Sequence, residues 1–128
     1  MSIEIQELFE RYAERYMAGD VEAVADMYTA PFLAVRNGGP IYLADRASVV
    51  EHLAGLMIAY ARSGAAVAEI SDIDLLEQGD SATLVTVHWN VRPASGEMIR
   101  DFRTSYQLVG RPSRIVSYVN HDVVGATE

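Results

Sequence analysis

The sequence contains no cysteine and no lysine, and each absence excludes a group of mechanisms. Without cysteine there is no disulfide, no zinc–thiolate site and no thiol nucleophile. All ten basic residues are arginine, whose guanidinium stays protonated, so a Schiff base on a lysine amine is excluded as well. No apolar run approaches the ~20 residues that cross a bilayer. Residues 1–7 lack the basic and apolar regions of a signal peptide, so we expect a cytoplasmic protein with no membrane partner.

Positive charge is scarce. Eighteen acidic residues against ten arginines give a formal net charge of −8. This charge repels the phosphate backbone, so we expect no nucleic-acid partner. A length of 128 residues with 50% hydrophobic residues is typical of one globular domain, and we expect a single domain over residues 1–128.

Three segments have the apolar spacing of amphipathic helices. In the first, the apolar residues are Ile5, Leu8, Phe9, Tyr12 and Tyr16. Asp20 is expected to cap a second helix, which turns Tyr28 inward and stops at Pro31. Asp45 is expected to cap a third helix over residues 46–62.

The remaining segments indicate strands. Residues 32–36 and 41–44 predict a short hairpin around a glycine-rich turn. Four longer strands follow, joined by short turns as in an antiparallel meander: residues 66–77, 81–92, 98–109 and 114–124. Imperfect alternation in the first of these predicts a bulge. Helices placed ahead of an antiparallel sheet indicate an α+β fold, with three helices packed on a curved sheet of four long strands plus a short hairpin. Such a sheet forms a cone with a hollow at one end.

This element order resembles the nuclear-transport-factor-2-like superfamily, the cone fold of ketosteroid isomerase and the SnoaL-like polyketide cyclases. Short stretches at residues 11–28, 44–53 and 103–116 carry the resemblance. It implies a SnoaL-like domain over residues 1–128 that binds or transforms a small hydrophobic, polyketide-like or steroid-like ligand. If the protein is an enzyme, the resemblance implies metal-free acid–base chemistry of the isomerase, cyclase or dehydratase type.

The isomerase activity itself is not expected. Counted from the Gly19–Asp20 step, Tyr12 matches the tyrosine that donates to the substrate oxygen in the isomerase. Arg36 falls at the position of the proton carrier, and Ser105 falls at that of the second oxyanion donor. An arginine, with a pKa above ~12, cannot shuttle a proton at neutral pH. The sequence therefore departs from the isomerase at two of these three positions.

His52 is the first candidate for a general base, because imidazole titrates near neutral pH. It lies beside Val49 and Leu56 at the edge of the third helix's apolar stripe, and the resemblance places this position on the pocket wall. Tyr12 would donate a hydrogen bond to a substrate oxygen, and Tyr16, one turn further on, would contact the ligand. The alternatives are a boundary histidine with a structural partner and tyrosines that serve only as core.

The predicted strand 98–109 has two different faces. One carries Arg100, Phe102, Thr104, Tyr106 and Leu108; the other carries Asp101, Arg103, Ser105 and Gln107. The resemblance implies that the polar face lines the hollow, which makes Asp101, Arg103 and Ser105 candidate ligand-binding residues. The alternative is that the apolar set packs under the helices and the polar set is solvated, since burying the apolar face is the stronger physical drive.

On the last strand, Tyr118, Asn120 and Asp122 share one parity, which the resemblance places at the hollow. Trp89 would supply an aromatic wall. We expect Trp89, Tyr118 and Asn120 to bind the ligand, and Tyr12, Trp89 and Tyr118 to line one cavity.

No metal site and no cofactor are expected. The three histidines are far apart in the sequence, and the acidic residues at 72–80 are explained by a solvated turn. No phosphate-binding glycine motif is present.

Apolar residues on both faces of the late strands predict a homodimer paired through the sheet. The alternative function is a non-enzymatic dimeric interaction module that uses the outer sheet face, with the hollow filled by core side chains.

Overall fold

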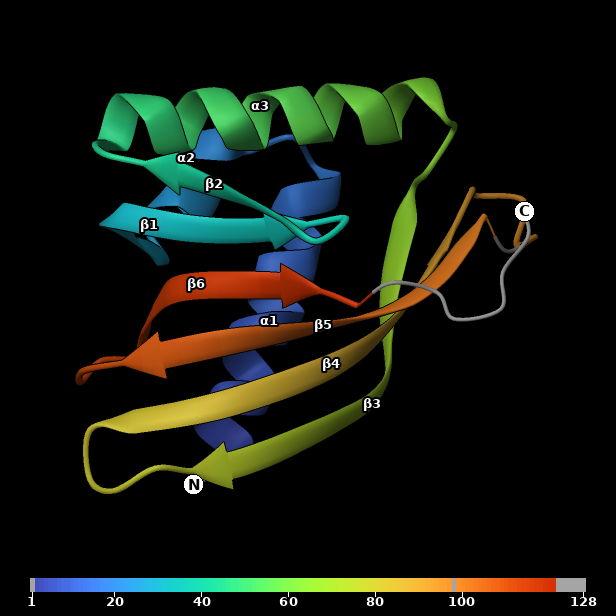
Figure 1. Cartoon of the computed structure of the whole chain (residues 1–128). Coiled ribbons are helices and arrows are strands. Elements are labelled where there is room, and N and C mark those ends of the chain that lie inside the picture. Colours follow the sequence, from blue (N-terminus) through green and yellow to red (C-terminus); the bar gives the residue numbers. More distant parts are fainter. Residues whose placement is uncertain (1, 98, 122–128) are drawn as a thin grey trace.

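A computed structural model of the chain describes residues 2–97 and 99–121. Three helices lie along one face of a curved, open sheet of six strands (Figure 1). In chain order the elements are α1 (Ser2–Met17), α2 (Val21–Ala25), β1 (Tyr28–Arg36), β2 (Gly39–Leu43), α3 (Arg46–Arg62), β3 (Val67–Glu77), β4 (Ala82–Arg92), β5 (Arg100–Val109) and β6 (Arg114–Asn120). The predicted α+β fold with three helices on a curved sheet is confirmed.

The sheet has the order β2-β1-β6-β5-β4-β3, so the last strand lies between the first and the fifth. Strands β3 to β6 form the predicted antiparallel meander, and β1 and β2 form the predicted hairpin. These two units join where β1 pairs with β6 in parallel, a pairing that the sequence analysis does not include. The bulge expected in β3 lies between Ile70 and Asp72.

Helix α1 covers β3 and α3 lies along β1 and β2 (Figure 1). The Asp45 carboxylate accepts a hydrogen bond from the Ser48 backbone N–H at 2.9 Å, so α3 begins after its predicted cap. At the end of α1, Gly19 adopts φ 75°, a left-handed conformation that glycine accommodates without Cβ strain. In the described part of the chain, no helix is long and apolar enough to cross a membrane.

The second helix is shorter than predicted. It ends at Ala25, and Tyr28 begins β1 instead of continuing the helix. Pro31 lies within β1, not at a helix end. Tyr28 is 2% exposed, so its inward direction is as expected, but pairing of β1 with β2 and β6 takes precedence over the local helical spacing. Residues 98 and 122–124 of the predicted strands lie outside the described residues, and so does Asp122.

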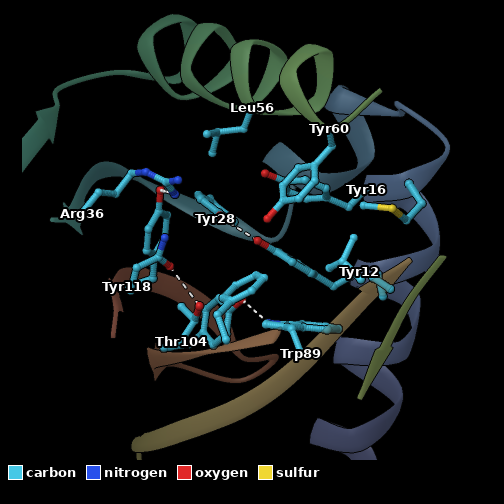
Figure 2. A pocket seen from close by; sticks show the side chains of 16 residues that line it. Tyr12, Tyr16, Tyr28, Arg36, Leu56, Tyr60, Trp89, Thr104 and Tyr118 are labelled. Atoms are coloured by element: carbon cyan, nitrogen blue, oxygen red, sulfur yellow. Dashed lines mark hydrogen bonds between the residues drawn. The ribbon is translucent and has the colours of Figure 1, made fainter. Parts of the chain in front are cut away.

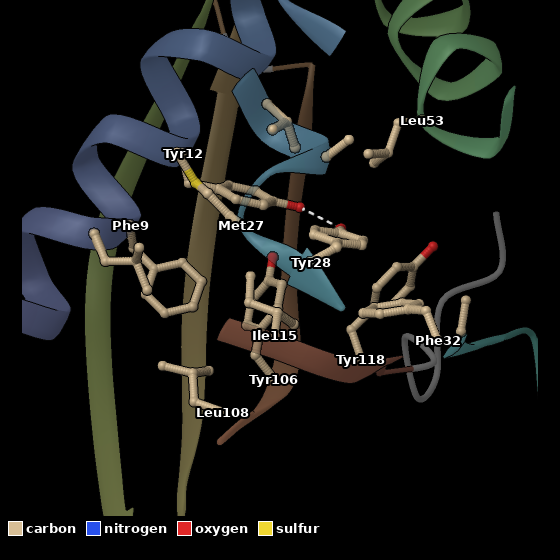
Figure 3. Packing of buried hydrophobic residues seen from close by; sticks show 14 of the residues in the cluster. Phe9, Tyr12, Met27, Tyr28, Phe32, Leu53, Tyr106, Leu108, Ile115 and Tyr118 are labelled. Carbon is tan, nitrogen blue, oxygen red and sulfur yellow. Dashed lines mark hydrogen bonds between the residues drawn. The ribbon is translucent and has the colours of Figure 1, made fainter. Parts of the chain in front are cut away.

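The core fills the space between the helices and the inner sheet face (Figure 3). Phe9 of α1 and Leu53 of α3 are completely buried. The Phe9 ring packs on that of Tyr106 in β5, with centroids 4.7 Å apart. Tyr12, Tyr28, Tyr106 and Tyr118 belong to this core and also line a cavity beside it.

Candidate functional site

The cavity lies between α1, α3 and the inner face of the sheet, and its volume is about 60 Å3 (Figure 2). Six tyrosines from five elements reach its wall: Tyr12, Tyr16, Tyr28, Tyr60, Tyr106 and Tyr118. Trp89 and Phe102 add two further aromatic rings. Aromatic rings therefore form most of the wall, and phenolic hydroxyls are its main polar groups.

Hydrogen bonds hold several of these polar groups in place. The hydroxyls of Tyr12 and Tyr28 are 2.9 Å apart, and the Trp89 indole N–H donates to the Tyr106 hydroxyl at 2.9 Å. Burial, followed by the neighbouring tyrosines, raises the pKa of Tyr12 well above its ordinary value. The pKa of Tyr28 is also raised well above its ordinary value, and burial is again the largest cause. These hydroxyls therefore stay protonated at neutral pH, and since one proton serves the bond between them, at most one of the two can be donated to an oxygen atom of a ligand.

The Tyr118 hydroxyl of β6 contacts both Arg36 and His52 at the end of the cavity near β1. Arg36 Nη1 donates to the Tyr118 hydroxyl at 3.2 Å, and His52 Nε2 lies 2.8 Å from the same oxygen. Burial, and then the charge of Arg36, lower the pKa of His52 below its ordinary value. His52 is thus neutral at pH 7 and, in the tautomer with the proton on Nδ1, its Nε2 accepts a hydrogen bond from the Tyr118 hydroxyl.

The structure brings most of the expected site residues together. Tyr12, Trp89 and Tyr118 line one cavity, as the sequence analysis expects, and Tyr16 and Asn120 line it too. The rings of Tyr12 and Trp89 are 6.2 Å apart.

His52 is placed differently. It is half-buried beside the cavity and is not among the residues that line it. His52 contacts the hydroxyl of Tyr118, which does line the cavity. Its role as a general base stays a prediction, but one that operates through a tyrosine.

The expected orientation of β5 is wrong. Phe102, Thr104 and Tyr106 line the cavity, whereas Asp101, Arg103 and Ser105 point to the opposite, outer face of the sheet. Burial of the apolar set against α1 and the core decides the orientation.

Several polar side chains on the outer face of β5 have hydrogen-bond partners on neighbouring segments. The Ser105 hydroxyl bonds with that of Thr86 at 2.8 Å and with His121 Nε2 at 2.8 Å. Asp101 pairs with His88. Ser105 therefore does not stand at an oxyanion position of the cavity, and Asp101 and Arg103 do not reach it.

Sequence reasoning missed several wall residues, of which Arg36 is the most informative. Arg36 shares the inward parity of Phe32 and Ala34 on β1, so alternation alone could have placed it in the cavity. Tyr28 was hidden by the overlong second helix. Tyr60, in the last part of α3, lines the cavity as well and was not singled out from the sequence.

The described residues contain no group of three or more His, Asp or Glu side chains arranged to hold a metal ion.

Several solved structures share the fold. An NTF2-like protein with a cystatin-like fold from Novosphingobium aromaticivorans is 21% identical, with a TM-score of 0.77 over 98% of this chain and 84% of that chain. An NTF2-like protein of unknown function from Shewanella oneidensis MR-1 is 15% identical, with a TM-score of 0.73 over 94% of this chain and 98% of that chain. A protein from Catenulispora acidiphila in complex with S-DNPA is 18% identical, with a TM-score of 0.70 over 93% of this chain and 92% of that chain.

No curated protein sequence matches the chain significantly. The family assignment comes instead from a match over nearly the whole length. Residues 3–123 match the family described as NTF2-like protein (DUF6841), and the chain belongs to this family of nuclear-transport-factor-2-like proteins.

Proposed function

We propose that the chain binds a small, ring-bearing and mostly apolar molecule in the cavity between α1, α3 and the sheet. The observation that carries this proposal is the convergence of six tyrosines and Trp89 on one cavity. Aromatic walls with a few fixed polar groups are typical of small-molecule sites, because the rings bury the apolar body and the polar groups set its orientation. The complex of the Catenulispora acidiphila protein with S-DNPA supports a ligand-binding role for this fold.

The dimensions favour a ligand of one or two rings. The cavity of about 60 Å3 is small beside the ~300 Å3 at the lower end of ligand pockets. Tyr16 and Tyr60 are half-buried, and their rings meet edge to face at 5.9 Å. Outward rotation of these two side chains would enlarge the cavity without disturbing the fully buried core.

Trp89 provides the test, because it is the chain's one tryptophan and lies on the cavity wall. We expect one- and two-ring aromatic compounds to shift the single indole N–H signal in 15N–1H spectra, in a saturable manner. Ala68→Leu, which adds volume to the cavity wall, should weaken this binding. Val67→Leu places the same side chain on the opposite face of β3 and should leave binding unchanged. An indole signal that no ring compound shifts would contradict the proposed function.

Acid–base chemistry is a second candidate, favoured by the 2.8 Å contact between His52 Nε2 and the Tyr118 hydroxyl. In this scheme the Tyr118 oxygen takes a proton from a substrate carbon while the Tyr118 proton moves to His52 Nε2. The protonated Arg36 guanidinium, 3.2 Å away, stabilises negative charge on the oxygen during the transfer.

Deuterium exchange tests this second candidate without a known substrate. With 2-tetralone in D2O, we expect the protein to accelerate exchange of the α C–H above the buffer rate. Tyr118→Phe and His52→Gln should each reduce that acceleration by about 10²-fold. If the wild-type protein binds the ketone but leaves its exchange rate at the buffer value, the function is binding alone.

We also propose that the chain is not a ketosteroid isomerase. Arg36, which falls where the isomerase has its proton carrier, lines the cavity as a permanent cation. A β,γ-unsaturated ketosteroid should remain unconverted. Turnover within tenfold of an ordinary enzyme's, about 10 per second, would contradict this expectation.

A further inference from the structure

Arg36 is the one charged side chain on the cavity wall of the described chain. Three other arginines have carboxylate partners: Arg15, Arg46 and Arg92 pair with Asp20, Glu22 and Glu69, among others. Arg36, although half-buried, forms no ion pair with any described residue and has one hydrogen bond, to Tyr118. A guanidinium carries five N–H donors, so most of the Arg36 donors are not taken up by the described protein.

The rest of the wall adds donors rather than negative charge. No Asp or Glu is among the described residues that line the cavity. Figure 2 shows Arg36 extending from β1 on one side, with Tyr16 and Tyr60 on the other. Burial raises the pKa of Tyr60, and the charges of Arg100 and then of Arg36 oppose this shift. The described wall therefore offers a cation and neutral polar groups, with no carboxylate among them.

A partly desolvated cation without an anion is unfavourable, because the lost hydration is not replaced. The chain has eighteen acidic residues that could have supplied a partner, yet none of those described is paired with Arg36. An incoming anion would supply the missing partner. Planar carboxylates suit this role best, because the guanidinium fork binds two oxygens at once.

We propose that the ligand of this cavity is a ring compound with one carboxylate, and that Arg36 binds the carboxylate while the ring lies against the aromatic wall. This inference rests on the proposed function and adds to it the charge and the chemical class of the ligand. The selectivity is local to Arg36, because the net charge of the whole chain, −8, repels anions in general.

The test compares isosteric probes that differ in charge. Benzoate is titrated against benzamide, and 2-naphthoate against 2-naphthamide, with the Trp89 indole signal as the readout. In the wild-type protein we expect each acid to bind at least about tenfold more tightly than its amide. In Arg36→Gln this ratio should fall to about one, and in Arg36→Lys it should stay above one, because the positive charge remains.

Arg103→Gln is the matched control. It removes one positive charge as well, but from the outer face of β5, and the ratio should stay as in the wild type. Chemical-shift dispersion shows whether each variant is folded, and Arg36→Lys keeps the test informative if Arg36→Gln does not fold. Acids and amides that bind the wild-type protein equally would overturn this inference and leave the proposed function standing. Failure of all four probes to shift the indole signal would overturn both.

Discussion

The Tyr118 hydroxyl is a point where three elements meet through hydrogen bonds. It lies on β6, accepts from Arg36 of β1, and contacts His52 of α3. Burial raises the pKa of Tyr118, and the hydrogen bond and charge of Arg36 oppose that shift. The hydroxyl is therefore protonated at rest, between a permanent cation and a neutral imidazole. This arrangement couples the charge of one residue to the protonation of the other two.

His52 makes stability depend on pH. Burial and the charge of Arg36 lower the pKa of His52 in the folded chain below the ordinary 6.5. At pH values between the folded pKa and 6.5, the unfolded chain therefore holds the proton more tightly than the folded chain. The free energy of unfolding should therefore fall as pH falls below about 6.5. His52→Gln should remove this part of the pH dependence in urea unfolding measured at pH 7.5 and pH 5.5. The exposed His121, changed to Gln, is the control, and equal pH dependence in wild type and His52→Gln would contradict the prediction.

The family resemblance places Tyr12, Trp89 and Tyr118 at one cavity, and the structure agrees because each lies on the buried face of its own element. For β5 the resemblance implies the wrong face, and the structure has the alternative, in which the apolar set is buried. One face packs into the core and the other forms side-chain hydrogen bonds with β4, such as Ser105 with Thr86. Single-chain alternation does not distinguish these faces, since the deciding contacts come from α1 and from β4. The alternation of β1 would have placed Arg36 at the cavity, but the sequence analysis treats Arg36 only as a residue that cannot carry a proton.

At the scale of elements, local signals located the first and third helices and the hairpins well, but extended the second helix into β1. The third helix covers Arg46–Arg62 in the structure, as its cap and apolar stripe predict. The register of β1 was harder, because its start, Tyr28, continues the helical spacing of α2 and its parallel partner, β6, lies more than 80 residues further along the chain. Contacts of that separation leave no mark in a local pattern.

Glycine at position 55 in α3 is expected to weaken that helix. Gly55 is exposed, and a Cβ added there would meet nothing within 4 Å. Gly55→Ala should therefore raise the free energy of unfolding by about 0.5–1 kcal/mol, because alanine loses less backbone entropy in a helix. Gly19→Ala should lower the free energy of unfolding by about 1–2 kcal/mol, because the φ of 75° at this position strains any residue with a Cβ. Urea unfolding of the two variants measures both effects, and a loss of stability in Gly55→Ala would contradict the first.

At the scale of the molecule, none of the described helices covers the outer face of the sheet. It is apolar toward β1, β2 and β6, where Leu33, Tyr42 and Val119 are 39%, 69% and 42% exposed. Leu33 and Tyr42 are cross-strand neighbours, so these side chains are contiguous rather than scattered. We propose that a second copy of the chain covers this face, as the resemblance to sheet-paired dimers implies.

Sedimentation velocity at micromolar concentration should therefore show a dimer. Val119→Glu, which places a charge within the exposed apolar group, should shift the protein toward monomer. Ile58→Glu changes an apolar residue on α3 that is also exposed, away from the sheet, and should leave the dimer intact. A wild-type monomer at this concentration would contradict the expectation.

The central position of β6 has a consequence for synthesis on the ribosome. The β1–β2 hairpin and the β3–β5 meander are made first, but only β6 bonds the two parts of the sheet together. Until residues 114–120 leave the exit tunnel, the nascent chain carries two open edges and an aromatic core that lacks Ile115 and Tyr118. We therefore expect the complete sheet to form only after β6 is translated, because β6, the last of the described strands, closes both the core and the site beside it.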